Sequence, residues 1–281
     1  MYDTIIIGGG PSGISAAIYL RRFNRNVLVI MKDYGALEKA HVIENYYGTN
    51  KINGLELAKT GVKQAQDLGV DVVFDEALKV DGYGSFEVKT VNNTYYGKSV
   101  LLATGKARGK EKIKGARELV GQGVSYCAVC DGFLYRGKNI GIVGNGEFML
   151  EELSVLSNFS ENITIFTNGL DLEKDTQYRV MKDMIKNVDL ADEVLEVNLE
   201  NDKVKVDALF LAEGSPNAVD FARTIGAVIE NSNIVVDDKM MTNIPGLFAC
   251  GDAIGGILQV SKAVNDGANA ANMIHKYLNL K

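Results

Sequence analysis

The sequence predicts an α/β fold with two three-layer domains, the second inserted into the first. A strand, a glycine-rich turn and a helix follow one another at residues 4–23, and the same succession returns at residues 139–156. Each succession is typical of the start of a Rossmann-like domain, in which parallel strands alternate with helices. A later apolar strand, at residues 208–212, runs into Gly214-Ser215-Pro216-Asn217. There we expect the chain to return from the second domain to the first.

Length and composition agree with this organisation. A chain of 281 residues is long enough for one large domain or two ordinary ones. Its 46% hydrophobic residues, 30 glycines and 3 prolines argue against a disordered or fibrous protein. We expect a discontinuous first domain of residues 1–110 and 213–281 and an inserted domain of residues 111–212. The net charge of -6 argues against general nucleic-acid binding.

The first strand, turn and helix carry a dinucleotide fingerprint. After the apolar run Thr4–Ile7, the residues Gly8, Gly10 and Gly13 follow the spacing GxGxxG, and a helical periodicity continues to Phe23. Glycines at this spacing let backbone N–H groups approach a pyrophosphate at the positive end of the helix. A glycine-rich turn that binds nothing is the alternative.

The segments around the two fingerprints are expected to supply the remaining elements. In chain order we expect a strand at 26–31, a helix at 54–68, strands at 70–74, 86–91 and 95–102, a helix at 178–185, strands at 194–197, 204–206 and 234–237, and a final helix at 258–278. The dipeptide Asn92-Asn93 predicts a hairpin turn between the strands at 86–91 and 95–102. The latter strand ends in Ala103-Thr104-Gly105, which predicts a tight turn.

The second fingerprint departs from the first. Its turn reads Gly144-Asn145-Gly146, but the bulky Met149 holds its third position, where a small residue permits close packing of helix on strand. Glu147 adds a negative charge where a pyrophosphate would lie. After the next strand, residues 167–169 read Thr-Asn-Gly and offer neither an acid for a ribose nor an arginine for a 2′-phosphate. On these residues, a domain that binds a nucleotide and one that does not both remain open.

A basic segment precedes the inserted domain. Residues 106–118 contain four lysines and two arginines against two glutamates, in a chain that is acidic overall. Two interpretations remain open for it. The segment is either a solvated connector or a docking surface for an acidic partner.

The stretch Gly123–Gly132, which reads GVSYCAVCDG, indicates redox chemistry. Cys127 and Cys130 form a Cys-x-x-Cys pair that can close into a disulfide ring, and a following helix or a nearby charge can make one of them an exchange nucleophile. A zinc site is the alternative. It would need four ligands, and only His41 and His275 are at hand. Neither histidine has a motif around it, and we assign them no role and expect no metal.

Cysteine usage and hydropathy suggest the cellular setting. Three cysteines are too few for a disulfide scaffold, and the first residues enter a strand without a basic and apolar leader. We therefore expect a protein of the reducing cytoplasm. No apolar run approaches the ~20 residues that a membrane helix needs, so no membrane association is expected. We expect Cys250 to be a small buried packing residue rather than a third redox thiol.

Together these motifs resemble the low-molecular-weight thioredoxin reductases, flavoproteins whose inserted domain carries a redox dithiol. The resemblance runs through nearly the whole chain. It rests on Gly8-x-Gly10-x-x-Gly13, Glu44-Asn45-x-x-Gly48, Ala103-Thr104-Gly105, the stretch Gly123–Gly132, Ser215-Pro216-Asn217, and Pro245-Gly246-Leu247-Phe248-Ala249-x-Gly251-Asp252. The long stretch around the cysteines is highly specific for this family.

The resemblance implies FAD as cofactor, thioredoxin as substrate and a homodimer. Cys130 would lie nearest the isoalloxazine and accept its electrons, Cys127 would attack the disulfide of thioredoxin, and Asp131 would exchange protons with the dithiol. The positions that match FAD-binding ones are Gly8, Gly10, Pro11, Ser12, Gly13, Asn45, Ala103, Gly251, Asp252 and Gln259. The arginine that usually accompanies the glutamine is absent, and Ala36 stands where another glutamine is expected.

The sequence departs from NADPH-dependent members of the family at the electron donor. Those members have an intact second fingerprint and a His-Arg-Arg cluster for the 2′-phosphate. Without a cationic partner that phosphate loses charge-assisted hydrogen bonds of roughly 1.5–3 kcal/mol each, so NADPH is a poor candidate. The pattern resembles the ferredoxin-dependent flavin thioredoxin reductases, in which reduced ferredoxin supplies electrons to FAD. The basic segment would suit an acidic ferredoxin.

Two other functions stay open. One is a reductase that uses NADPH or NADH through contacts the motifs do not identify. The other is a non-catalytic FAD-binding redox sensor, whose flavin would not pass electrons to thioredoxin.

Overall fold

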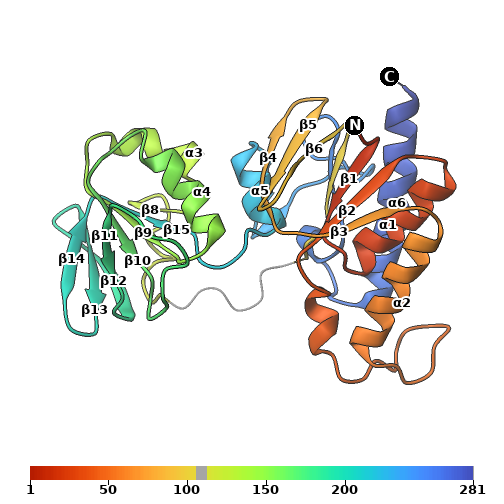
Figure 1. Cartoon of the computed structure of the whole chain (residues 1–281), viewed down its shortest axis with the longest axis horizontal. Coiled ribbons are helices and arrows are strands. Elements are labelled where there is room, and N and C mark those ends of the chain that lie inside the picture. Colours follow the sequence, from red (N-terminus) through yellow and green to blue (C-terminus); the bar gives the residue numbers. More distant parts are fainter. Residues whose placement is uncertain (106–112, 281) are drawn as a thin grey trace. The chain divides into compact units, whose positions relative to one another are not determined.

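The computed structural model describes residues 1–105 and 113–280. The chain forms two compact units, one made of Met1–Lys106 and Asn217–Lys281 and the other of Ala107–Pro216 (Figure 1). Each unit contains a parallel five-stranded sheet with additional helices and strands. The predicted α/β class is confirmed.

The first unit is built on a parallel sheet with the strand order β18-β7-β1-β2-β3. Its strands are β1 (Thr4–Ile7), β2 (Val27–Met31), β3 (Asp71–Phe74), β7 (Val100–Leu102) and β18 (Leu247–Ala249). The register places Ile6 between Val29 and Leu101. Since side chains alternate between the two faces of a strand and β1, β2 and β7 are buried throughout, both faces of the sheet must be covered.

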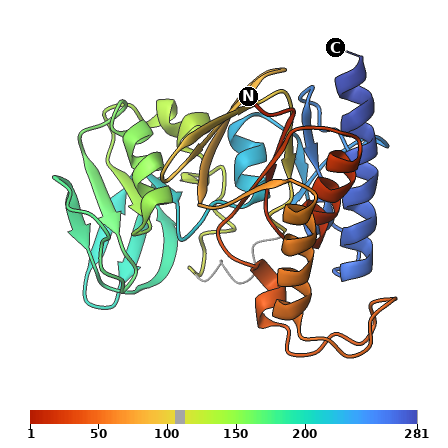
Figure 2. The same cartoon turned by 45° about the vertical axis from the view of Figure 1, so that its right-hand side comes forward.

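Helices cover one face of this sheet. They are α1 (Pro11–Arg22), α2 (Gly54–Asp67) and α6 (Val260–Asn279). The side chains of Ile6 and Val29 pack there with Leu20 of α1 and Ile274 of α6. Figure 2 shows α1 (red) and α6 (blue) side by side, in agreement with their extensive contacts. The two helices approach closely because α6 carries a glycine at position 267, facing α1.

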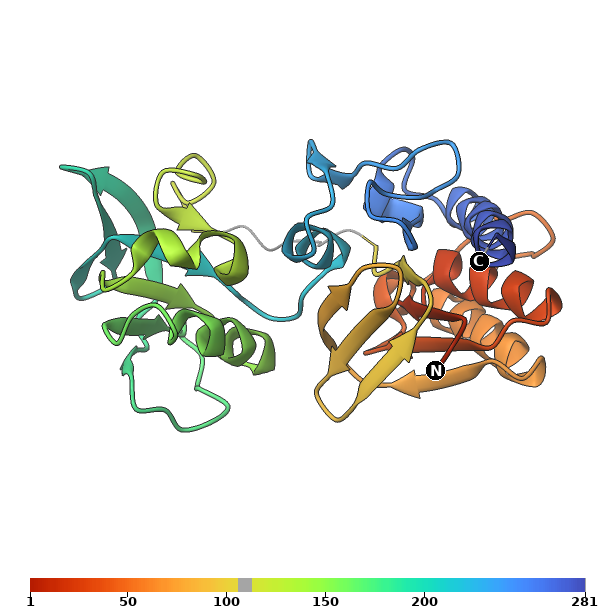
Figure 3. The same ribbon diagram turned by 90° about the horizontal axis from the view of Figure 1, so that it is seen from above.

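Antiparallel strands and a short helix cover the other face (Figure 3). These elements are β4 (Ala77–Gly82), β5 (Phe86–Thr90), β6 (Thr94–Gly97) and α5 (Ala218–Thr224), and the unit also contains η1 (Gly35–Lys39), η3 (Gly251–Ile254), β16 (Ile229–Glu230) and β17 (Asn233–Ile234). Phe86 and Phe221 pack against Ile5 and Ile7 in one apolar core. The unit therefore has the three layers that the sequence predicts.

The inserted unit repeats this plan. Its parallel sheet has the order β11-β10-β9-β15-β8, and a second sheet, β12-β13-β14, is antiparallel. The elements are β8 (Val124–Ser125), α3 (Ala128–Asp131), η2 (Gly132–Tyr135), β9 (Ile140–Val143), α4 (Glu147–Leu156), β10 (Ile163–Phe166), β11 (Arg179–Met181), β12 (Ile185–Ala191), β13 (Val194–Leu199), β14 (Lys203–Val206) and β15 (Ala208–Leu211). Val143 and Leu209 of the parallel sheet share a core with Val188 and Val197 of the antiparallel sheet.

The helix predicted at residues 178–185 is wrong. Residues Arg179–Met181 form strand β11, which pairs in parallel with β10, and strand β12 begins at Ile185. Ile185 and Val188 are buried in the core between the two sheets. Strand pairing and the burial of β-branched side chains override the weak helical periodicity of this segment.

The strand predicted at residues 95–102 is two strands. Thr94–Gly97 pairs with β5, whereas Val100–Leu102 belongs to the parallel sheet. The chain changes sheet at Ser99, whose hydroxyl contacts that of Thr4 over 3.0 Å and donates to the carbonyl of Asp3 over 2.9 Å. The segment expected as one strand is therefore divided between two sheets.

Candidate active site

The two predicted redox cysteines form a disulfide in the inserted unit. Cys127 follows strand β8 and caps helix α3, which begins at Ala128. The backbone N–H of Cys130 donates to Cys127 Sγ over 3.1 Å. Cys127 is buried and Cys130 is half-buried. Cys130 is therefore the more accessible cysteine in the disulfide state.

Asp131, the predicted proton carrier, is held beside the disulfide by Ser125. The Ser125 hydroxyl donates to Asp131 Oδ2 over 2.6 Å and accepts the backbone N–H of Cys127 over 3.1 Å. Burial, followed by the carboxylates of Asp131 and Asp207, raises the pKa of Tyr135. Ser125 thus connects the carboxylate to the backbone of one cysteine of the disulfide. The motif around the cysteines contained Ser125, but the residue received no role from the sequence.

The first glycine-rich turn leaves room at the N-terminus of α1. Gly8 adopts a φ of +113°, and a Cβ at Gly13 would lie 1.9 Å from the Gly8 carbonyl oxygen. Gly10 caps α1 without a side-chain hydrogen bond, and a Cβ there would meet no atom within 4 Å. The helix thus begins with Pro11 at its first position and with backbone donors that no side chain caps. Such a terminus suits an anionic group.

Other predicted cofactor residues gather at the same edge of the sheet. The N–H of Ala103 donates to the Ile7 carbonyl over 2.8 Å, and a Cβ at Gly251 would lie 2.5 Å from Ser12 Oγ. Ligands of open α/β sheets bind at this carboxyl edge of the strands. Within the described residues, the hydroxyl of Thr104 is buried without a hydrogen-bond partner. The unpartnered hydroxyl, the uncapped helix and the space at Gly10 all fit a dinucleotide such as FAD.

The remaining predicted cofactor residues lie near the start of α6. Asn45 Nδ2 donates to Gln259 Oε1 over 2.9 Å, so the structure brings these two residues together. Asp252 belongs to η3, immediately after Gly251. Two residues that the sequence did not single out hold this turn. Lys262 Nζ donates to the Gly251 carbonyl over 2.8 Å, and the buried Asp266 accepts the Gly251 N–H over 3.2 Å. Lys262 and Asp266 also form an ion pair at 2.7 Å. Their i,i+4 spacing on α6 is the sequence signal that could have identified the pair.

The second glycine-rich turn is covered by its own chain. A Cβ at Gly146 would lie 3.0 Å from Glu173 Oε1 and 3.1 Å from Glu173 Oε2. The backbone N–H of Glu173 donates to the Asn145 carbonyl over 3.0 Å. Lys174 pairs with Glu147 in the first turn of α4 over 2.5 Å. A carboxylate thus occupies the place at a helix N-terminus where a pyrophosphate would otherwise be expected.

The residues after strand β10 are also engaged within the unit. Asn168 Oδ1 accepts the Ile185 N–H over 2.9 Å, and its Nδ2 donates to Glu213 Oε1 over 3.2 Å. The Thr167 hydroxyl donates to the Leu170 carbonyl over 2.5 Å. These side chains support the loop that covers the second turn. Met149, the bulky residue of this fingerprint, is completely buried.

Four other predictions lie outside this chemistry. Most of the basic segment, residues 106–112, lies outside the described part of the chain. Cys250 is a free, completely buried thiol, and burial raises its pKa to about 12. Within residues 1–105 and 113–280, no three His, Cys, Asp or Glu side chains are grouped so that they could bind a metal, and no helix is long and apolar enough to cross a membrane.

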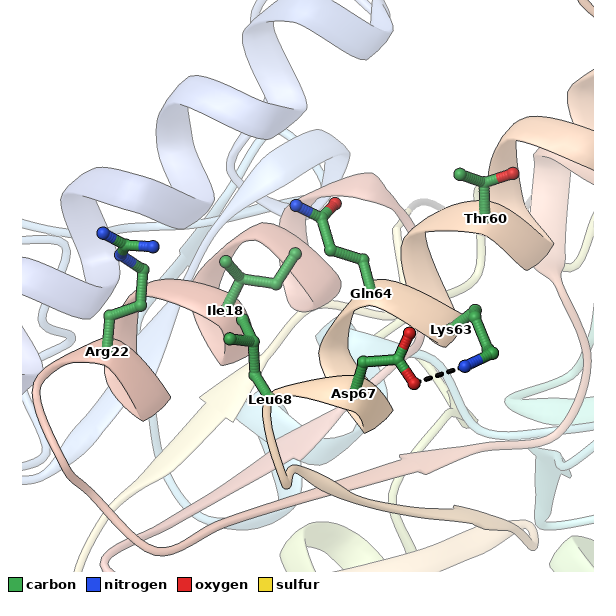
Figure 4. A pocket seen from close by; sticks show the side chains of 7 residues that line it. All are labelled: Ile18, Arg22, Thr60, Lys63, Gln64, Asp67 and Leu68. Atoms are coloured by element: carbon green, nitrogen blue, oxygen red, sulfur yellow. Dashed lines mark hydrogen bonds and ion pairs between the residues drawn. The ribbon is translucent and has the colours of Figure 1, made fainter.

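A pocket of about 440 Å³ lies elsewhere on the first unit (Figure 4). Side chains of α1 and α2 line it, and Lys63 and Asp67 form an ion pair at its rim. None of the residues predicted to bind the cofactor or carry the dithiol lines this pocket. It is therefore separate from the sheet edge where those cofactor residues gather.

Comparisons with known proteins agree with the motifs. The family described as pyridine nucleotide-disulphide oxidoreductase matches residues 2–267. A thioredoxin reductase of Listeria innocua is 31% identical over 99% of this chain and 94% of its own length. The chain belongs to the thioredoxin reductase family. This reductase resembles the crystal structure of an atypical thioredoxin reductase from Desulfovibrio vulgaris Hildenborough, with a TM-score of 0.93 and 30% identity over 100% of this chain and 99% of that one.

A second solved structure also matches the whole chain. The ferredoxin-flavin thioredoxin reductase of Clostridium acetobutylicum has a TM-score of 0.74 and 28% identity with this reductase, over 100% of this chain and 99% of that one. The family resemblance predicted from the motifs is confirmed, and membership implies a flavin cofactor and disulfide oxidoreductase chemistry.

Proposed function

We propose that this flavoprotein reduces thioredoxin through FAD and the Cys127–Cys130 dithiol, with reduced ferredoxin as the electron donor. The observation that carries the choice of donor is the carboxylate of Glu173 at the N-terminus of α4. A pyridine nucleotide that bound to the second Rossmann-like fold would place a pyrophosphate at this helix end. It would there meet the negative charge of Glu173.

The described residues after strand β10 offer no free cation to the 2′-phosphate of NADPH. The amide of Asn168 already bonds with Ile185 and Glu213. A 2′-phosphate without a cationic partner forgoes charge-assisted hydrogen bonds of roughly 1.5–3 kcal/mol each. Lys174 is near the turn, but it is paired with Glu147. The chemistry of this surface therefore favours a donor that does not bind there, and the ferredoxin-flavin enzyme of Clostridium acetobutylicum supports ferredoxin as that donor.

The first unit would hold FAD. We propose that the N–H groups after Gly10 bind the pyrophosphate of FAD. The other residues that we propose to surround FAD are Ser12, Ala103, Gly251, Asp252, Gln259 at the start of α6, and Asn45, which is hydrogen-bonded to Gln259. FAD, when bound, supplies a centre that takes electrons singly and releases them in pairs. The donor supplies single electrons, and reduction of a disulfide needs two. The uncapped helix and the orphaned Thr104 hydroxyl support this placement.

The dithiol would carry the electrons to the substrate. Reduction of the Cys127–Cys130 disulfide takes two electrons and two protons and gives two thiols. Cys127, as thiolate, would attack the substrate disulfide, and Cys130 would then displace the substrate from the mixed disulfide and restore the Cys127–Cys130 bond. Asp131 would move protons to and from these sulfurs. Because Cys127 is buried in the disulfide state, its attack requires the α3 turn to open after reduction.

Exposed apolar side chains beside the dithiol suit a protein substrate. Val129, Phe133 and Leu134 are 44%, 56% and 61% exposed, and they lie within four residues of Cys130 in the sequence. Large exposed apolar side chains gathered at one site mark interaction surfaces. We propose that these three side chains contact thioredoxin.

The proposed domain organisation follows the sequence. Residues 1–110 and 213–281 would form the FAD-binding domain, and residues 111–212 the redox domain. In turnover the redox domain would have to meet the flavin and then thioredoxin, with residues 214–217 as a hinge. We further propose that the protein is a homodimer and that it acts in the cytoplasm.

An anaerobic titration of the yellow holoenzyme tests the donor. Reduced ferredoxin, NADPH and NADH are added in separate experiments, and the flavin absorbance is followed. Stoichiometric bleaching by ferredoxin, with neither nucleotide reacting, supports the proposal. Rapid stoichiometric bleaching by NADPH or NADH, without reaction of ferredoxin, would replace it with a pyridine nucleotide-dependent reductase. Bleaching without subsequent reduction of thioredoxin would favour the redox sensor.

A further inference from the structure

A buried carboxylate lies directly behind the dithiol. Glu152 belongs to helix α4 and is 7% exposed. Its neighbours on the buried side of the helix are the apolar residues Met149, Leu153 and Leu156. A glutamate in such an apolar stripe is costly unless it is hydrogen-bonded. Its position therefore calls for a specific partner.

That partner is the backbone of the dithiol helix. Glu152 Oε2 accepts the backbone N–H of Ala128 over 2.7 Å. Ala128 is the first residue of α3, and Cys127 is its N-cap. The Glu152 carboxylate thus contacts the N–H of the peptide bond between Cys127 and Ala128. The N–H of Cys130, from the same short helix, points instead to Cys127 Sγ.

The charge at this place opposes the usual effect of a helix terminus. Free backbone N–H groups at the N-terminus of a helix stabilise a thiolate. The Ala128 N–H is engaged by Glu152, and a nearby carboxylate disfavours a second negative charge on sulfur. A dithiol–disulfide couple whose reduced form is stabilised is a stronger oxidant. A couple whose reduced form is less stabilised is, conversely, a stronger reductant.

We propose that Glu152 is a positioning residue that keeps the Cys127–Cys130 couple strongly reducing by holding a carboxylate on the first N–H of the dithiol helix. The inference rests on the proposed function in that Cys127 and Cys130 are the redox pair. It concerns the equilibrium between disulfide and dithiol, and it requires neither ferredoxin nor thioredoxin.

The variant Glu152→Gln tests this directly. It keeps an oxygen that can accept the Ala128 N–H but removes the charge. The holoenzyme is equilibrated anaerobically at fixed pH with mixtures of reduced and oxidised dithiothreitol. In this exchange dithiothreitol gives two electrons and two protons to the protein disulfide and forms its own disulfide. After acid quenching and denaturing alkylation, the oxidised chain carries one label, on Cys250, and the reduced chain carries three.

At a pH above the pKa of the wild-type thiol, we expect Glu152→Gln to be half-reduced at an approximately tenfold lower ratio of reduced to oxidised dithiothreitol, because removal of the neighbouring charge lowers the thiol pKa by about one unit or more. For this two-electron couple, that corresponds to a potential about 30 mV higher. The reduced variant should also be alkylated faster at Cys127 at neutral pH, because a larger fraction is thiolate. A purely structural hydrogen bond would move neither quantity.

Two further variants serve as controls for the change in potential. Glu151→Gln removes the same charge from the adjacent position of α4, where the side chain is not buried, and should leave the potential unchanged. Glu152→Asp keeps a charge but withdraws it from Ala128, and should raise the potential by less than Glu152→Gln; it decides the matter if the glutamine variant does not fold. An unchanged potential in the folded Gln or Asp variant, or an equal shift in Glu151→Gln, would overturn the proposal. Failure of ferredoxin to reduce the flavin would leave this result untouched.

Discussion

Glu173 holds its carboxylate against Gly146, at the N-terminus of helix α4. A Cβ at position 146 would come within 3.0 Å of the Glu173 side chain, whose backbone N–H is bonded to the Asn145 carbonyl. The inserted unit thus keeps the Rossmann-like strand, turn and helix but covers its anion-binding end with its own acid. This relationship underlies the proposal that electrons do not come from a pyridine nucleotide.

Thermal stability should not respond to NADPH. A ligand at 100 times its Kd would add about 2.7 kcal/mol to the free energy of unfolding and raise the Tm by a few degrees. Because the Glu173 carboxylate at the N-terminus of α4 would repel a pyrophosphate, we expect no shift with 1 mM NADPH in a scan of the holoenzyme. Added FAD, given to protein stripped of flavin, is the control and should raise the Tm. A rise in Tm with NADPH comparable to that with FAD would contradict the inference that Glu173 prevents a pyridine nucleotide from binding at the second glycine-rich turn.

Proton transfer at the dithiol should depend on Asp131. Its carboxylate accepts the Ser125 hydroxyl over 2.6 Å and follows Cys130 directly. We expect Asp131→Asn to lower the rate of thioredoxin reduction roughly 100- to 10,000-fold, as for the loss of a general acid or base. Flavin reduction by the donor should persist. Asp207→Asn is the matched control, since Asp207 also lies near Tyr135, and an equal loss in that variant would count against a specific role for Asp131.

The apolar surface beside the dithiol should determine the affinity for thioredoxin. The double variant Phe133→Ala and Leu134→Ala removes two side chains that are 56% and 61% exposed. We expect the KM for thioredoxin to rise about tenfold or more, since central apolar residues of an interface commonly contribute over 1 kcal/mol each, and kcat to change little. Leu190→Ala, on strand β12 of the same unit and 44% exposed, should leave KM unchanged. Equal effects of the two changes would indicate a general loss of fold.

The contact of α1 with α6 should tolerate no side chain at Gly267. A Cβ there would lie 2.1 Å from the Ser12 carbonyl oxygen, whereas one at Gly61 of α2 would lie 3.3 Å from a flexible methyl group of Ile14. Gly267→Ala should destabilise the protein by about 1–3 kcal/mol through overpacking and lower its flavin content. Gly61→Ala should be neutral or stabilise by up to about 1 kcal/mol. Denaturant unfolding and the flavin absorbance per chain measure both, and the reverse order would contradict the structure.

Local signals predicted the parts of the site that follow one another along the chain. Gly8, Gly10 and Gly13 need only a strand and a helix to form the turn, and Cys127 and Cys130 are close because only two residues of a helical turn separate them. Contacts between distant segments could not be predicted in this way. Glu152 meets Ala128 from another helix, Glu173 folds back on Gly146, and Lys262 holds Gly251 through tertiary packing.

The predicted secondary structure was wrong where tertiary contacts outweighed local periodicity. The segment expected as a helix at 178–185 became strands because β10 offered an edge to pair with and the core between the two sheets took up Ile185 and Val188. The strand expected at 95–102 divides at Ser99, where hydrogen bonds to Thr4 and Asp3 turn the chain from one sheet into another. Neither outcome depends on propensity alone.

The most direct test measures the yield of reduced thioredoxin for each electron supplied. Under anaerobic conditions the holoenzyme and oxidised thioredoxin receive a limited amount of either reduced ferredoxin or NADPH, and thioredoxin thiols are then counted. We expect one thioredoxin dithiol for every two electrons from ferredoxin, none from NADPH, and none with the Cys127→Ser, Cys130→Ser variant. A stoichiometric yield from NADPH, or an undiminished yield with the double cysteine variant, would contradict the proposed function.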